Sequence, residues 1–172
     1  MKEIYTTKIH QLLNEKNERH LFSIYCETAF RGDFYMELRL DQSTQAGLLY
    51  SFYEGRFRDK GGFISYVLKN GNPSDSIVDA LVNIDYRPYI VTTSLSETDL
   101  TTIMITLAEN PMPSVKGKTR GLDGWSIYFD DFINDTTYSY WGYPPAGYEH
   151  LTIVNNIIAK YLNERYEGLY PT

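Results

Sequence analysis

Three histidines and one cysteine are the side chains best suited to acid–base or nucleophilic chemistry in this chain of 172 residues. His10, His20 and His150 are dispersed, and none lies in a nucleophile-elbow or metalloprotease pattern. Cys26 follows a largely apolar run, so we expect a small buried side chain rather than a nucleophile. A glycine-rich phosphate-binding loop is absent from the sequence. The sequence therefore predicts no catalytic residue and no cofactor.

Carboxylates and aromatic rings gather near the C-terminus. Asp130, Asp131 and Asp135 supply oxygen atoms, but their spacing lacks the ligand alternation and terminal glutamate of a calcium loop, so the sequence predicts no metal site. Together with Tyr138 and Tyr140 they form a candidate partner-binding surface. Rings bury contact area, and carboxylates attract a basic protein partner.

The same segment has an alternative interpretation as an ordinary exposed hairpin. Its two aromatic-rich runs flank a polar turn at residues 134–135, and the Gly- and Pro-rich residues 142–147 end the second run. In this interpretation the carboxylates solvate the outer face of the hairpin. The core is then filled by Trp125, Phe129 and Trp141.

The chain as a whole is acidic. Sixteen Lys and Arg residues against 22 Asp and Glu residues give a formal net charge of −6 and a pI near 5.0. This charge repels phosphates, so we expect no nucleic-acid binding. No run approaches the ~18 apolar residues of a membrane span, and the N-terminal residues lack the apolar region of a signal peptide. We therefore expect a cytoplasmic protein that does not enter a membrane.

Tyrosine is unusually frequent, with 16 residues beside 8 Phe and 2 Trp. Its apolar ring and polar tip suit half-buried strands and binding surfaces alike. Two interpretations follow: the rings fill the faces of a β-rich fold, or some of them form a recognition surface.

Helices are expected in four parts of the chain. The clearest covers residues 96–109, with Ser94 or Ser96 as its N-cap. Its apolar positions have the spacing of one helical face: Leu100, Ile103, Met104 and Leu107. Residues 148–162 and 4–16 are also expected to be helical, and the apolar spacing in residues 74–84 suits a further helix.

Strands are expected as local hairpins. Residues 21–30 and 34–40 flank a turn at residues 31–33, and residues 48–58 and 63–69 form a second pair. Residues 87–93 read as a short strand, and residues 112–121 as a basic loop. In the strand over residues 34–40, period two places four apolar residues on one face and Glu37 and Arg39 on the other.

These elements predict a single α+β domain over residues 1–172. The strand pairs are local hairpins rather than βαβ units. We therefore expect an antiparallel sheet built from hairpins, with helices packed on one face.

In size, acidity and lack of a catalytic set, the chain resembles the small acidic cytoplasmic proteins that neutralise bacterial toxins. The resemblance implies a non-enzymatic protein-binding module of the immunity or inhibitor type, with a basic protein as its partner. One alternative is a hydrolase-like enzyme whose site is assembled from dispersed Asp, Glu and His residues. Another is a structural or interaction domain, and no sequence feature specifies an oligomeric state.

Overall fold

The computed structural model describes residues 2–28, 32–55, 81–110, 115–116, 124–144 and 146–171. The predicted strand at 63–69, most of the predicted helix at 74–84 and most of the basic loop at 112–121 lie outside the described residues. Among the described residues, no helix is long and apolar enough to cross a membrane.

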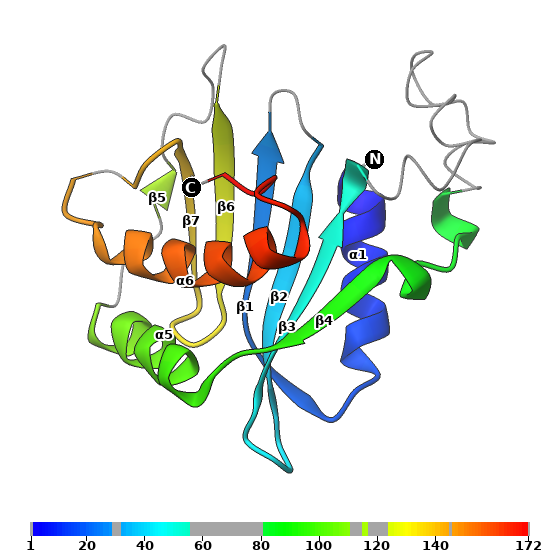
Figure 1. The fold of residues 1–172 in the computed structure, drawn as a ribbon, viewed down its shortest axis with the longest axis horizontal. Coiled ribbons are helices and arrows are strands. Elements are labelled where there is room, and N and C mark those ends of the chain that lie inside the picture. Colours follow the sequence, from blue (N-terminus) through cyan, green and yellow to red (C-terminus); the bar gives the residue numbers. More distant parts are fainter. Residues whose placement is uncertain are drawn as a thin grey trace.

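A seven-stranded sheet forms the centre of the described structure (Figure 1). Neighbouring strands are antiparallel, except that β5 runs parallel to β7. In order across the sheet the strands are β4 (Ile90–Ser94), β3 (Gly47–Tyr53), β2 (Phe34–Asp41), β1 (Glu18–Thr28), β6 (Trp125–Asp131), β7 (Thr136–Trp141) and β5 (Val115–Lys116).

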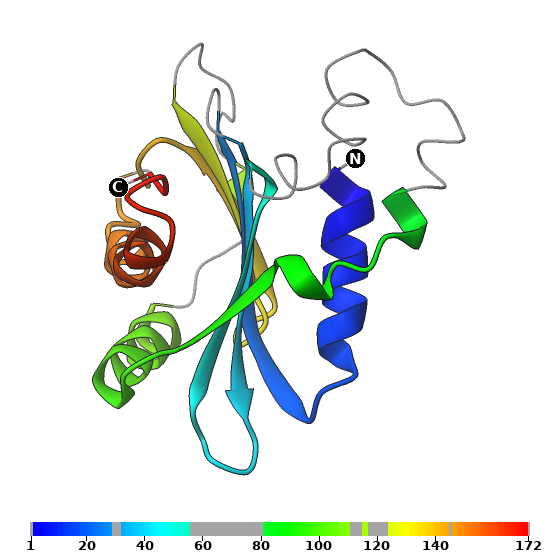
Figure 2. The same cartoon turned by 45° about the vertical axis from the view of Figure 1, so that its right-hand side comes forward.

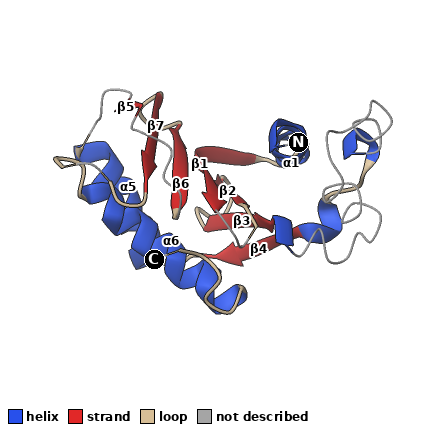
Figure 3. Cartoon of the chain, turned by 90° about the horizontal axis from the view of Figure 1, so that it is seen from above, coloured by secondary structure: helices blue, strands red, loops and turns tan. Residues whose placement is uncertain are grey.

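Helices lie on both faces of the sheet (Figures 2 and 3). The helices α5 (Glu97–Glu109) and α6 (His150–Arg165) cover one face, and α1 (Lys2–Asn14) lies on the other. A short 3-10 helix, η1 (Arg87–Tyr89), leads into β4. The predicted α+β class with an antiparallel sheet is confirmed. The prediction of helices on one face holds for α5 and α6, whereas α1 covers the opposite face.

The larger part of the core lies between the sheet and α5 and α6. On α5, Leu100, Ile103 and Leu107 are buried, whereas Met104 is partly buried. The helix begins after Ser96, whose side chain accepts a hydrogen bond from the backbone N–H of Asp99 at 3.1 Å. The N-cap is thus Ser96 rather than Ser94.

Strand β2 is buried on both of its faces. The four apolar residues predicted to share a face do so, and they pack toward α5 and α6: Phe34, Met36, Leu38 and Leu40. The opposite face carries Glu37 and Arg39, which are also buried. Near these two residues, α1 and its apolar side chains Ile9 and Leu13 cover the sheet.

A β-bulge interrupts the pairing of β1 with β2. His20 pairs with Arg39 and Phe22 pairs with Leu38, so Leu21 is the extra residue between them. Strict alternation from Phe22 would turn His20 toward α5 and α6. Because of the bulge, His20 instead shares the α1 face with Arg39.

Candidate functional site

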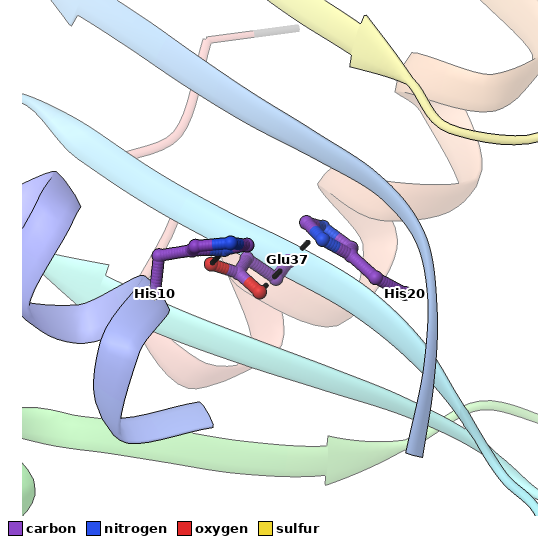
Figure 4. Close-up of side chains that lie close together, drawn as sticks. All are labelled: His10, His20 and Glu37. Carbon is purple, nitrogen blue, oxygen red and sulfur yellow. Dashed lines mark hydrogen bonds and ion pairs between the residues drawn. The ribbon is translucent and has the colours of Figure 1, made fainter. Parts of the chain in front are cut away.

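Glu37 is the centre of a polar cluster between α1 and the sheet (Figure 4). Its side chain is 0% exposed. Tyr35 and Arg39 lie on the same face of β2, two residues to either side. His10 reaches the cluster from α1, and His20 reaches it from β1. These five residues are called the Glu37 cluster below.

Four hydrogen bonds occupy the two oxygens of the Glu37 carboxylate. Oε2 accepts from Nε and Nη2 of Arg39, at 2.8 and 2.6 Å. Oε1 accepts from the Tyr35 hydroxyl at 2.6 Å, and Nδ1 of His10 lies 2.9 Å from the same oxygen. Because an ionised carboxylate only accepts, Nδ1 of His10 carries a proton in this arrangement.

Arg39 also connects the cluster to the end of α1. Its Nη1 donates to the backbone carbonyl oxygen of Leu13 at 3.1 Å, and its Nη2 donates to Oδ1 of Asn14 at 2.8 Å. The guanidinium is 1% exposed, and its charge is matched by the Glu37 carboxylate. The pair therefore holds the last turn of α1 on the sheet through charge-assisted hydrogen bonds.

One ring nitrogen of His20 has no hydrogen-bond partner among the described residues. This atom, Nε2, is buried and lies 3.5 Å from Oε2 of Glu37 without a hydrogen bond to it. A backbone hydrogen bond at Phe22 favours the protonated ring. Nε2 is the ring nitrogen on the side of the cluster.

The cluster keeps Glu37 ionised and His20 neutral near pH 7. Burial raises the pKa of the Glu37 carboxyl, but hydrogen bonds from His10 and Tyr35 and electrostatic interactions with His20 and Arg39 outweigh burial and lower the pKa to about 2. Burial lowers the pKa of His20 to about 4, although the negative charge of Glu37 acts to raise it. A carboxylate with so low a pKa is a weak base, so we assign no general base to Glu37.

The cluster does contain donor atoms of the kinds that bind transition metals. One nitrogen from each of His10 and His20 and an oxygen of Glu37 lie within 4.8 Å of one another. In the described part of the chain, this is the one group of three such residues. Imidazole nitrogens and carboxylate oxygens are both ligands of zinc.

The structure separates the five residues of the predicted partner-binding surface. Asp130 and Asp135 are exposed, whereas Asp131, Tyr138 and Tyr140 are buried. Both tyrosine rings belong to the core on the α5 and α6 face, because alternation along β7 turns them inward together. These rings do not form a surface, and of the five residues Asp130 and Asp135 are the two that a partner can reach.

Asp131 instead fixes the turn between β6 and β7. Its Oδ1 accepts from the backbone N–H groups of Ile133 and Asn134, at 2.9 and 3.2 Å. Its Oδ2 accepts from the side-chain amide of Asn134 at 2.8 Å, and that amide also donates to the carbonyl oxygen of Leu107 at 3.0 Å. Both oxygens of the Asp131 carboxylate therefore accept hydrogen bonds from within the turn. The Asn134 amide, which one of them orients, connects the turn to α5.

The same turn exposes two large apolar side chains between carboxylates. Phe132 is 50% exposed and Ile133 is 37% exposed. Asp130 and Asp135 precede and follow them in the sequence and are also exposed. The backbone N–H of Phe132 donates to the carbonyl oxygen of Leu21 at 3.0 Å, which fixes the turn to β1. We call Asp130, Phe132, Ile133 and Asp135 the turn surface.

Other residues singled out in the sequence have varied environments. Cys26 is fully buried as predicted, and burial raises the pKa of its thiol well above the ordinary range. Of the three aromatic residues predicted for the core, Phe129 is buried, Trp125 is half-buried and Trp141 is exposed. The hairpin interpretation is therefore right for Phe129 and wrong for Trp141.

A groove of about 400 Å³ lies between α1 and β4, with Leu12, Tyr50 and Ile90 in its lining. Lys16 at its rim donates to the hydroxyl of Tyr50 at 3.0 Å, and this hydroxyl donates to Glu18 at 2.6 Å. Because these polar groups are hydrogen-bonded to one another, we assign no ligand to the groove.

The Glu37 cluster could not be predicted from the sequence, because its members come from three separate elements, α1, β1 and β2. His10 and Glu37 are 27 residues apart, so no local spacing connects them. The one available signal is the alternation of Tyr35, Glu37 and Arg39, which equally describes an exposed strand face.

Comparisons with protein-family models, with curated proteins and with solved structures found no match for this chain.

Proposed function

We propose that this chain is a non-enzymatic protein-binding module of the immunity or inhibitor type, which binds a basic protein through its turn surface. The observation that carries the proposal is the exposed ring of Phe132, placed between two exposed carboxylates in a turn with a fixed backbone. The proposal includes the cytoplasmic location and the bacterial source expected from the sequence.

The turn surface has the properties of a preorganised anchor. Half of the surface of Phe132 is available for burial against a partner, and Ile133 lies beside it. The hydrogen bonds of Asp131 already order the backbone of the turn. Binding would therefore cost little backbone entropy, which favours a small, rigid contact with an aromatic residue near its centre.

Charge specifies the class of partner. The chain has a formal net charge of −6, and Asp130 and Asp135 add local negative charge beside the exposed ring. Carboxylates at the rim of an interface mainly accelerate encounter with a basic surface, and salt screens this effect. The exposed ring then slows dissociation by burying apolar area.

The test compares the wild-type chain with three variants: Phe132→Ala, Asp130→Asn with Asp135→Asn, and Tyr143→Ala. Tyr143 is the matched control because it is an aromatic residue outside the turn and is 73% exposed. Each immobilised protein is exposed to native lysate, and bound proteins are quantified by mass spectrometry. We expect a basic protein that wild type and Tyr143→Ala capture equally and Phe132→Ala captures weakly.

Association kinetics with that purified partner then separate the two contributions. The double Asn variant should associate more slowly and show a weaker salt dependence, whereas Phe132→Ala should mainly dissociate faster. Urea unfolding of every variant checks that the fold is kept. If no captured basic protein distinguishes Phe132→Ala from Tyr143→Ala, or if salt and the carboxylates leave the association rate unchanged, the turn surface is not the interface.

The hydrolase alternative has one supporting observation, at the start of β2. Burial raises the pKa of the Asp33 carboxyl, although hydrogen bonds from Tyr25 and Thr28 act to lower it. The negative charge of the nearby Glu54 raises this pKa further. Paired carboxyl groups with different environments are typical of acid–base catalysis. The alternative predicts hydrolysis of simple ester, phosphate or glycoside substrates that Asp33→Asn abolishes and Asp135→Asn does not. A wild-type chain without turnover on these substrates would count against it.

A further inference from the structure

We propose that His10, His20 and Glu37 form a zinc-binding site between α1 and the sheet. They supply two imidazole nitrogens and one carboxylate oxygen, a donor set that zinc uses where a fourth position is left for water. The three donor atoms come from α1, β1 and β2 and converge within 4.8 Å (Figure 4). The ring of Phe132, which belongs to the turn surface, stacks on His20 with ring centroids 4.0 Å apart, so the two proposals are tested through different substitutions.

Two distances in the cluster, each to a different oxygen of the Glu37 carboxylate, are close to the spacing of ligand atoms in a zinc site, whereas the three donor atoms together lie within 4.8 Å of one another. With Zn–N and Zn–O bonds of about 2.0–2.2 Å and tetrahedral angles, ligand atoms are about 3.3 Å apart. Nδ1 of His10 lies 2.9 Å from Oε1 of Glu37, and Nε2 of His20 lies 3.5 Å from Oε2. A zinc ion can therefore replace the proton between His10 and Glu37, once side-chain rotation brings the two imidazoles closer together.

His20 is the residue that points most directly to a metal. Its Nε2 is buried and has no hydrogen-bond partner among the described residues, so this desolvated polar atom lacks compensation. Metal-binding histidines usually donate their second ring N–H to a carbonyl or carboxylate, and a backbone hydrogen bond at Phe22 contributes to the pKa of this ring.

The surroundings of Glu37 set the expected strength of binding. Tyr35 and Arg39 already donate to the carboxylate, as outer partners of a metal-binding carboxylate do. Arg39 also adds a positive charge that opposes a divalent cation, so we expect micromolar affinity rather than that of a structural zinc site. His10 is 36% exposed and gives the ion and a water molecule access from solvent.

The nitrogen donors define which cations the site accepts. Magnesium and calcium prefer oxygen ligands, whereas imidazole suits zinc and nickel. Zinc should therefore bind and magnesium should not. Cobalt provides a spectroscopic probe, because a tetrahedral site with nitrogen ligands gives it an intense visible absorption.

The experiment titrates zinc into the EDTA-treated chain of 172 residues and measures heat and the midpoint of thermal unfolding. The chain has three histidines, so His10→Gln, His20→Gln and the control His150→Gln cover all of them. We expect one zinc per chain and a raised unfolding midpoint for wild type and His150→Gln. The affinity should fall at least tenfold in His10→Gln and His20→Gln, with loss of the cobalt absorption.

Three results would overturn the site: no saturable zinc binding by the wild type, equal binding by all three variants, or loss of binding in His150→Gln alone. Far-UV circular dichroism of the metal-free variants checks folding. If His20→Gln does not fold, the His10→Gln variant decides, because His10 is only partly buried, and its unchanged zinc affinity refutes the site. Capture experiments with the turn variants run in EDTA and zinc titrations use the histidine variants, so each proposal is refuted by its own set of measurements.

Discussion

Removal of either partner of the Glu37–Arg39 pair should strongly destabilise the protein. The two side chains are 0% and 1% exposed and share two hydrogen bonds of 2.6 and 2.8 Å. Glu37→Gln keeps the shape of the side chain but leaves the Arg39 cation buried without its counter-charge. Arg39→Met keeps most of the length and leaves the Glu37 carboxylate without its cation.

The magnitude follows from the cost of breaking a buried ion pair from one side, which is about 3–5 kcal/mol. The pKa of Glu37 is lowered from 4.5 to about 2, but hydrogen bonds from His10 and Tyr35 contribute more to this shift than the charge of Arg39, so the shift does not measure the pair by itself. We expect each single variant to lose about 3 kcal/mol, a large part of the stability of an ordinary domain.

The assay is a double-mutant cycle from urea unfolding in EDTA at 25 °C. Because the double variant Glu37→Gln with Arg39→Met buries no charge from this pair, its loss should be smaller than the sum of the single losses by about 2 kcal/mol. Single losses below about 1 kcal/mol, or a coupling below about 0.5 kcal/mol, would show that the pair is hydrated in solution and refute the reasoning.

Two further predictions concern α5. Leu107 is almost fully buried, so Leu107→Ala should cost about 2–5 kcal/mol in the same unfolding assay, and a loss below about 0.5 kcal/mol would contradict its packing. Hydrogen bonds from Tyr161, Lys160 and Ser96 lower the pKa of the Asp99 carboxyl to about 2, so its stabilising contribution exists above about pH 3.8 and is lost as the pH falls toward 2. A carboxyl titration followed by NMR should show this value, and Tyr161→Phe should raise it; an unchanged pKa in the variant would contradict the assignment.

Local periodicity made much of the fold predictable. Leu100, Ile103 and Leu107 repeat at helical spacing, and the helix begins after Ser96 and ends before Asn110, so α5 follows from neighbouring residues alone. The alternation of apolar and polar residues over 34–40 correctly predicted that the four apolar side chains share one face of the strand. What periodicity does not reveal is whether the second face is also covered, because that depends on where α1 packs.

The turn surface shows how a prediction from composition can include side chains that the fold buries. Asp131 lies two residues after Phe129, so period two already places it on the buried face. The inward position of Tyr138 follows from its pairing with Phe129, which depends on the length of the turn. The exposure of Phe132 could not be predicted from the sequence, because an isolated aromatic residue beside a turn is normally interpreted as part of the hydrophobic core.

The extra residue in β1 has a consequence for how related chains should be aligned. Glu18 to His20 pair with β2 in one register, and Phe22 onward pairs in the next, with Leu21 between them. Loss of Leu21 would join the two registers into a regular ladder and leave His20 on its present face. A gap at position 21 in a homologue therefore preserves the position of the histidine beside Glu37.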